Sequence, residues 1–242
     1  MNDPFNEIIQ KCVPNDHSRQ VNSEYYIDYV FNKDKNIRRI MDLGCGSGDS
    51  FEYFISRNSK ITWIGLDTVS SPEVNIRVRN DLHFVAYDGV NIPFDDNSFD
   101  VIFCNQVFEH VRYPDLLLKE TNRVLRPEGY FIGSVSSMEP YHSCSLWNYT
   151  PYGFSILVEK AGMELIELRP SIDAITLIVR KGMGYPHFFS RWWNKESPLN
   201  RVISLFGKVW GKDQRFINKI KLSFCGHFCF LVRKPLLEVL HG

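Results

Sequence analysis

Apolar runs of strand length alternate with segments of helical length along the first 170 residues of the chain. The run FDVIFCN at 99–105 is almost continuously apolar, which is typical of a strand covered on both faces of a sheet. The predicted strands are 39–43, 61–66, 82–87, 99–105 and 130–135, and the predicted helices are 49–57, 116–125 and 150–161. This alternation predicts an α/β fold, a Rossmann-like doubly wound sheet that is mostly parallel, with helices on both faces.

The length of 242 residues favours one decorated domain over two small ones. We expect an N-terminal helical segment at 1–36, a core formed by 37–170 and 224–242, and a helical insertion at 171–223. No apolar stretch approaches the roughly 20 residues of a spanning helix, and the N-terminus lacks the basic-then-apolar pattern of a secretory signal. The six cysteines are scattered through mostly apolar segments, which indicates free thiols and a cytoplasmic location.

A glycine-rich turn, GCGSG at 44–48, separates the first predicted strand from the first predicted helix. Such a turn lets a ligand approach bare backbone at a helix N-terminus. Its G-x-G-x-G spacing departs from the G-x-G-x-x-G of nicotinamide-dinucleotide sites. Asp42, Asp67 and Asp88 lie at the ends of three predicted strands, where Asp67 can accept hydrogen bonds from both ribose hydroxyls and Asp88 from an adenine amino group. Three carboxylates repel a polyphosphate, so the electrostatics favour S-adenosylmethionine over NAD or ATP.

With these motifs the chain resembles the class I S-adenosylmethionine-dependent methyltransferases of the small-molecule type, similar to those associated with polysaccharide synthesis. The resemblance rests on IMDLGCGSG, IGLD, YDGVNIPFDDNSFDVIFCNQVFEHV and VLRPEGYFIGSV, in that order along the chain. It implies that a sixth strand ends near Pro170 and that a last strand at 228–232 runs antiparallel beside it. The sequence pattern and the resemblance together predict ten residues that contact the cofactor: Asp42, Gly44, Gly46, Ser47, Asp67, Thr68, Asp88, Gly89, Asn105 and Gln106.

Methyl transfer to a hydroxyl requires removal of a proton, so we searched for a base whose pKa lies near neutrality. His142, in the polar and aromatic loop SSMEPYHSCSLWNYTP, is the first candidate. His110, after the fourth strand, is the second; its alternative role is to pack over the cofactor or to cap a turn. Glu109, Glu139 and Tyr141 are weaker candidates. The Pro-Tyr-His and Trp-x-x-Thr-Pro pieces of the loop imply, by resemblance, O-methylation of a sugar or glycan. A lipid-like or aromatic acceptor, and a catalytically silent cofactor-binding module, are the alternatives.

Cys225, His227 and Cys229 suggest a metal site, but strand geometry argues against it. Alternate residues of a strand are about 6.6 Å apart, whereas zinc ligands lie about 2.0–2.3 Å from the ion. We therefore predict no metal.

The segment 180–221 carries ten Lys and Arg residues against two acidic ones, although the whole chain has a net charge of zero. It also contains eight aromatic residues, and apolar positions recur at helical spacing in 199–210. One interpretation is a helical subdomain that covers the active site. Another is a surface, centred on 186–210, that contacts a membrane or an acidic partner and would place the protein at the membrane periphery. Single-stranded nucleic acid is a third, which the clustered aromatics disfavour.

Overall fold

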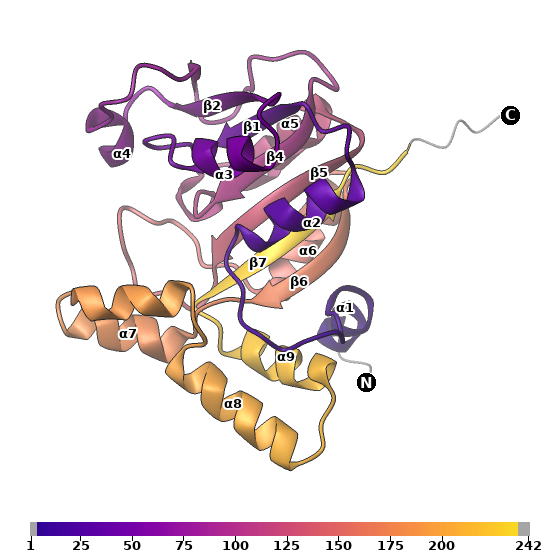
Figure 1. Ribbon diagram of the computed structural model, residues 1–242, viewed down its shortest axis with the longest axis vertical. Coiled ribbons are helices and arrows are strands. Elements are labelled where there is room, and N and C mark those ends of the chain that lie inside the picture. Colours follow the sequence, from indigo (N-terminus) through magenta and orange to yellow (C-terminus); the bar gives the residue numbers. More distant parts are fainter. Residues whose placement is uncertain (1–3, 237–242) are drawn as a thin grey trace, which may run out of the picture.

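The computed structural model describes residues 4–236, and within them one seven-stranded sheet forms the centre of the molecule (Figure 1). Its strand order is β3-β2-β1-β4-β5-β7-β6. The strands are β1 Arg39–Leu43, β2 Thr62–Thr68, β3 Phe84–Tyr87, β4 Phe99–Asn105, β5 Leu125–Ser136, β6 Glu164–Pro170 and β7 His227–Arg233. Neighbours from β3 to β5 pair in parallel, and β7 runs antiparallel to both β5 and β6. The predicted mostly parallel sheet with an antiparallel last strand is confirmed.

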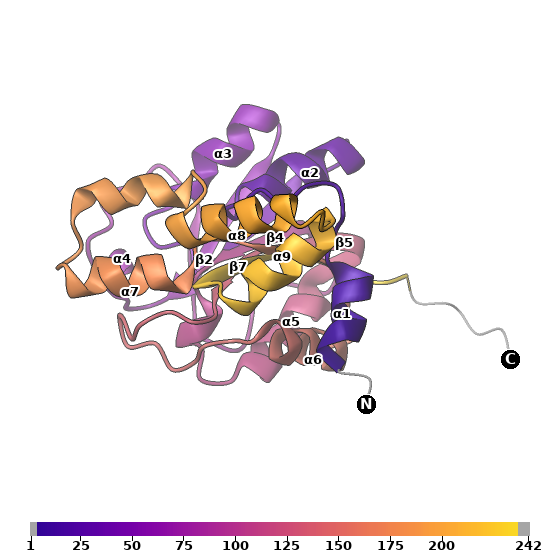
Figure 2. The same cartoon turned by 90° about the horizontal axis from the view of Figure 1, so that it is seen from below.

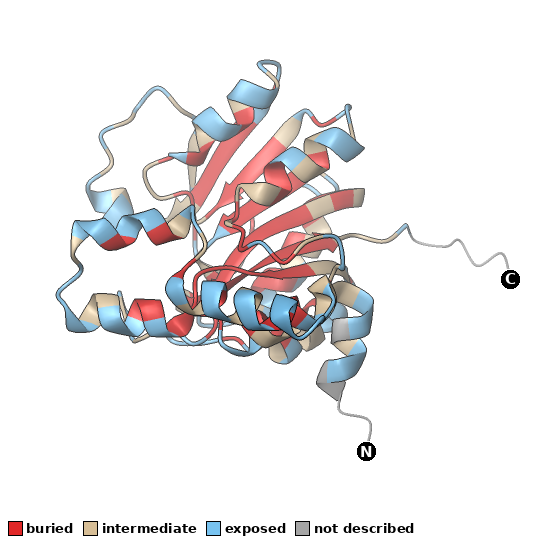
Figure 3. Ribbon diagram, turned by 60° about the horizontal axis from the view of Figure 1, so that its bottom comes forward, coloured by how far each residue is buried: buried red, intermediate tan, exposed pale blue. Residues whose placement is uncertain are grey.

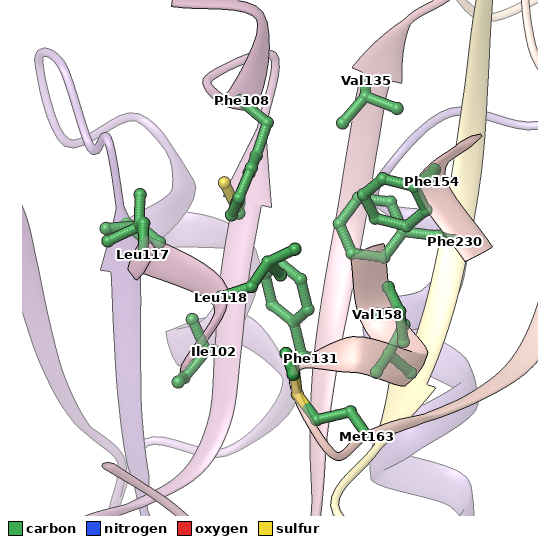
Figure 4. Packing of buried hydrophobic residues seen from close by; sticks show 14 of the residues in the cluster. Ile102, Phe108, Leu117, Leu118, Phe131, Val135, Phe154, Val158, Met163 and Phe230 are labelled. Atoms are coloured by element: carbon green, nitrogen blue, oxygen red, sulfur yellow. The ribbon is translucent and has the colours of Figure 1, made fainter. Parts of the chain in front are cut away.

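Helices cover both faces of this sheet because alternate strand residues point to opposite sides. In β4, Ile102 belongs to the apolar cluster under α5 (Pro114–Val124) and α6 (Pro151–Lys160). The adjacent Phe103 belongs to the cluster under α2 (Tyr25–Lys33) and α3 (Ser50–Arg57). Figure 3 shows the strands buried along most of their length, and Figure 4 shows the packing on the α5/α6 side. The near-continuous apolar run of β4 is therefore buried on both faces.

Local sequence signals explain several element boundaries. The side chain of Thr150 accepts a hydrogen bond from the backbone N–H of Gly153 at 3.0 Å, and Pro151 is the first helical residue, so α6 begins as predicted. β1 and β4 match the predicted strands residue for residue. β5 starts earlier than predicted, at Leu125. The short elements α4 (Pro72–Asn75) and η1 (Phe108–His110) were not predicted.

The segment expected to be an insertion holds α7 (Ala174–Gly182), η2 (His187–Trp193), α8 (Pro198–Val209) and α9 (Gln214–Ser223). In Figures 1 and 2, α8 and α9 lie side by side. The N-terminal segment, with α1 (Pro4–Cys12) and α2, is tied to this region through Gln20. Its side chain donates to the carbonyl of Trp192 at 2.7 Å and accepts from the side chain of Asn200 at 2.7 Å. Residues 237–242 of the expected core lie outside the described part of the chain.

Among the helices of residues 4–236, none combines the length and apolar character required to span a bilayer.

Candidate functional site

A cavity of about 760 Å³ opens at the carboxyl ends of β1, β2, β3 and β4. This is where the strand order reverses between β1 and β4, the usual ligand position in an open parallel sheet. Of the predicted cofactor residues, eight line it: Gly44, Gly46, Asp67, Thr68, Asp88, Gly89, Asn105 and Gln106. Ser143 and Cys144 also line it, so the loop that carries His142 forms part of the wall.

The glycine turn after β1 is held by its neighbours in a shape that only glycine permits. Gly44 has φ +73°, and a Cβ on it would lie 2.2 Å from Val107 Cγ2. The carboxylate of Asp67 accepts hydrogen bonds from the N–H groups of Gly46 and Thr68, both at 2.8 Å. Asp67 thus positions the loop and faces the cavity at the same time, which is the placement needed to bind a ribose.

Asp88 follows β3 as an exposed carboxylate at the edge of the cavity. It accepts hydrogen bonds from the backbone N–H groups of Val90 and Asn91 at 2.8 and 2.6 Å. The side-chain hydrogen bond from Asn91, followed by these backbone bonds, lowers the pKa of Asp88. Asp88 therefore stays ionised and available as an acceptor at neutral pH.

Two predicted cofactor residues, Asp42 and Ser47, are not among the residues that line the cavity. Asp42 is buried below the loop and accepts a hydrogen bond from the Ser50 hydroxyl at 2.5 Å. The same hydroxyl accepts from Trp63 Nε1 at 3.0 Å. Burial raises the pKa of Asp42 to about 7. Asp42 was predicted to contact the cofactor, whereas in this structure its carboxyl bonds to Ser50, the first residue of α3.

Asn105 and Gln106 form the wall after β4. The Ser134 hydroxyl donates to Asn105 Oδ1 at 2.6 Å, and Gln106 Nε2 donates to the same Ser134 oxygen at 2.9 Å. These bonds come from β5, the neighbouring strand, and hold both amides in place beside the cavity.

The two candidate bases lie together although they come from separate loops. The rings of His110 and His142 pack edge-on, with centroids 5.4 Å apart and an interplanar angle of 84°. His110 lines the cavity, and burial lowers its pKa. His142 Nδ1 lies 3.6 Å from a carboxylate oxygen of Glu139. The pair therefore has a carboxylate on one side and the cavity on the other.

Two glutamates that were weaker candidates for the base lie beside this pair: Glu109 is buried and Glu139 is partly buried. Ser136 Oγ lies 2.9 Å from Glu109 Oε1 and 2.5 Å from Glu139 Oε2, so its single proton can serve only one of them. Burial raises the pKa of Glu109 to about 7. Burial would also raise the pKa of Glu139, but the hydrogen bond and charge of His227, 2.6 Å away, lower it. Glu109 precedes His110 in the motif FEHV. A charged residue between apolar ones was the sequence signal that could have indicated a functional role for Glu109.

Cys225, which precedes β7, and Cys229, which lies in it, are core residues. Cys225 and Cys229 are fully buried, and His227 interacts with Glu139 and packs its ring against Trp193. A different group has metal-ligand chemistry: Glu109, His110 and His142 each place one donor atom within 4.8 Å of the others. Sequence spacing did not indicate this cluster, because its third member lies 32 residues further along the chain.

A second, shallower groove of about 630 Å³ lies between the His142 loop and α7. Its walls include the apolar side chains of Met138, Pro140 and Ile178, and Glu139 also lines it. Glu139, which lines this groove, also lies 3.6 Å from His142 Nδ1, so the groove is adjacent to the histidine pair.

Comparison with known proteins identifies the core. Residues 41–133 match the family model described as "Methyltransferase domain". A fatty-acid O-methyltransferase of Mycolicibacterium smegmatis is 29% identical over 68% of this chain and 61% of its own length. A phthiotriol/phenolphthiotriol dimycocerosates methyltransferase of Mycobacterium tuberculosis is 30% identical over 46% of this chain and 41% of its own. The chain thus spans less than two thirds of the length of these relatives.

Among solved structures, a phosphoethanolamine N-methyltransferase of Haemonchus contortus bound to S-adenosylhomocysteine has a TM-score of 0.56 at 17% identity. That alignment covers 88% of this chain and 52% of the other. At this identity the likeness concerns the fold alone. The sheet order and the glycine turn opposite Asp67 agree with the family match: residues 41–133 are similar to the methyltransferase-domain family, within the sheet order of the class I S-adenosylmethionine-dependent methyltransferase fold.

Proposed function

We propose that this protein methylates a hydroxyl group of a small, lipid-like acceptor, with His142 as the general base. The observation that carries the proposal is the packing of His142 against His110, which lines the cavity, with Glu139 beside His142. When bound, S-adenosylmethionine supplies a methyl group already activated on a sulfonium. The protein then needs to align the acceptor, which can be worth about 7–11 kcal/mol, and to remove its proton, worth roughly 10²- to 10⁴-fold.

The surroundings of His142 suit a base. The Glu139 carboxylate near Nδ1 stabilises the imidazolium that forms, and leaves the other ring nitrogen for the acceptor hydroxyl. Glu139 is itself held by Ser136 and His227. Burial lowers the pKa of His110, so the neighbouring ring stays neutral and does not repel the charge on His142.

The acceptor class draws on two observations. The groove beside the histidines has apolar walls, and the two mycobacterial relatives are named for a fatty acid and for phthiotriol lipids. A sugar or glycan is the second candidate, favoured by the polar loop 136–150, whose motif carries the resemblance to polysaccharide-associated enzymes. We expect the reaction in a reducing compartment, the cytoplasm, because all six cysteines are free.

The test is methyl transfer from S-adenosylmethionine with a tritiated methyl group to host extracts separated into lipid, nucleotide-sugar, glycan and protein fractions. We expect label in the lipid fraction. Label in the nucleotide-sugar or glycan fractions alone would show that the acceptor is a sugar or glycan and not a lipid. Binding of S-adenosylhomocysteine without any label would favour a catalytically silent module.

The role of His142 is tested with His142→Ala and, as a matched control, His83→Ala, which removes an exposed imidazole outside the cavity. We expect His142→Ala to lower turnover by at least about 100-fold with unchanged affinity for S-adenosylhomocysteine, and His83→Ala to change neither. Unchanged turnover in His142→Ala would remove His142 from the base role.

A further inference from the structure

We propose that the hairpin formed by α8 and α9 binds the surface of an anionic lipid membrane, with the outer face of α8 at the level of the headgroups. The hairpin packs against the N-terminal segment and α7 and takes no part in lining the cavity. The inference therefore goes beyond the proposed methyl transfer and does not depend on it.

The outer face of α8 is apolar from Val202 to Trp210, the residue that caps the helix at its C-terminus. Its exposed residues recur at i, i+3, i+4, i+7 and i+8, which forms one stripe on a helix. They are Val202, Leu205, Phe206, Val209 and Trp210. The exposed fractions of Leu205, Val209 and Trp210 are 61%, 70% and 67%, so the stripe faces solvent. A stripe of this size on a helix that already has a packing partner indicates a surface used for binding.

The opposite side of α8 is the side that packs inside the protein. A Cβ on Gly207 would lie 2.5 Å from Ile217 Cγ1, so α8 meets α9 closely at this glycine. Asn200, at the start of α8, is fully buried and donates to Gln20 and to the carbonyl of Ser171. Because these contacts fix the inward side, the apolar stripe is left outside. An apolar groove of about 200 Å³ between α8 and α9 extends it.

The charges around the stripe suit an anionic surface. Arg201, Lys208 and Lys212 are exposed, and between 198 and 221 the single acidic residue is Asp213, whose carboxylate caps α9 by accepting from the N–H of Phe216 at 2.8 Å. Basic residues near an anionic membrane contribute about 1 kcal/mol each. Lys221 is excluded from this set because it is buried and pairs with Glu196.

A second copy of the chain is the less favourable occupant. Two stripes brought face to face would also bring together the basic residues on both hairpins, and like charges at an interface are unfavourable. An anionic membrane can bury the apolar stripe among its lipids, and its negative headgroups can pair with these cations at the same time.

The test uses the full-length protein and flotation with vesicles of phosphatidylcholine, with or without phosphatidylglycerol. We expect binding to the anionic vesicles that weakens as salt is added. In the variant Leu205→Glu/Val209→Glu the affinity for the vesicles should fall by at least about tenfold. Each apolar side chain that leaves water on binding strengthens binding by about this factor, and the variant loses both. The matched control is Val78→Glu, which adds a charge at an apolar side chain that is 91% exposed and remote from the hairpin in sequence.

The outcomes separate the possibilities. Loss of vesicle binding in the double variant, with unchanged binding of S-adenosylhomocysteine and unchanged thermal stability, supports the inference. Absence of binding by the wild-type protein, or equal binding by wild type and the double variant, overturns it. A protein that is dimeric without vesicles and monomeric in the double variant would assign the stripe to a second copy instead. None of these readouts requires methyl transfer, so failure of the proposed function would be seen separately.

Discussion

Replacing Gly44 with alanine tests whether the glycine turn is shaped by its protein neighbour. At φ +73° an alanine costs about 1–2 kcal/mol in backbone strain. Its Cβ would also lie 2.2 Å and 2.8 Å from the two methyl carbons of Val107, and overpacking of this kind typically costs about 1–3 kcal/mol. We therefore expect Gly44→Ala to lower the free energy of unfolding by about 2–5 kcal/mol.

The chain offers a matched control at Gly184, which has φ +75° and open space where a Cβ would lie, with no neighbouring atom within 4 Å. Gly184→Ala should show the backbone strain alone. For a chain of this size each kcal/mol shifts Tm by about 2–4 °C, so Gly44→Ala should melt lower than Gly184→Ala by at least about 2 °C in thermal unfolding followed by circular dichroism.

A second variant isolates the contact. Val107→Ala in the Gly44→Ala background removes both close methyl groups, so the two substitutions should couple, with the double variant more stable than additivity predicts. Binding of S-adenosylhomocysteine, measured by calorimetry, should weaken in Gly44→Ala and not in Gly184→Ala, because Gly44 lines the cavity and Gly184 does not. Equal melting temperatures for the two alanine variants, or additive effects of Gly44→Ala and Val107→Ala, would refute this reasoning.

The buried cluster near the histidines leads to two further predictions. Burial raises the pKa of Glu109 from 4.5 to about 7, so the folded protein retains a proton that the unfolded chain has lost. Stability should then fall by up to about 3 kcal/mol as the pH rises from about 5 to 8, and Glu109→Gln should flatten that fall in urea unfolding; parallel curves would contradict it. Separately, Zn²⁺ should inhibit methyl transfer reversibly by binding Glu109, His110 and His142, whose donor atoms lie within 4.8 Å of one another. Glu109→Gln should raise the zinc concentration needed, and equal inhibition of both proteins would place the ion elsewhere.

Local patterns were sufficient for two strands of the sheet, β1 and β4. The apolar run of β4 and the strand before the glycine turn were predicted to the residue, because a strand covered on both faces requires continuous apolar character. The glycine turn and Asp67 also follow from sequence, since each lies at the end of a strand whose position along the chain is clear. By contrast, α7 and α9 were not predicted individually, because their boundaries depend on contacts with the rest of the insertion.

The arrangement of side chains around the proposed base depended on tertiary structure. Glu109, the Ser136–Glu139 segment and His227 come from three separate parts of the chain, and no spacing in the sequence indicates that one hydroxyl would lie between two carboxylates. Burial then changes their chemistry. Burial raises the pKa of the Glu109 side chain above the value of a glutamate in water. Only the fold determines which residues are removed from solvent in this way.

The sequence by itself determined the class of fold, the cofactor and the existence of an amphipathic helix at 199–210. It did not determine which way that helix faces. A stripe of apolar residues at helical spacing predicts burial against a core in most proteins. In this protein the small Gly207 lets α9 pack on the opposite side, and the buried Asn200 anchors that side to the N-terminal segment. Periodicity records which residues share a face of a helix, whereas packing against distant segments decides which face meets solvent.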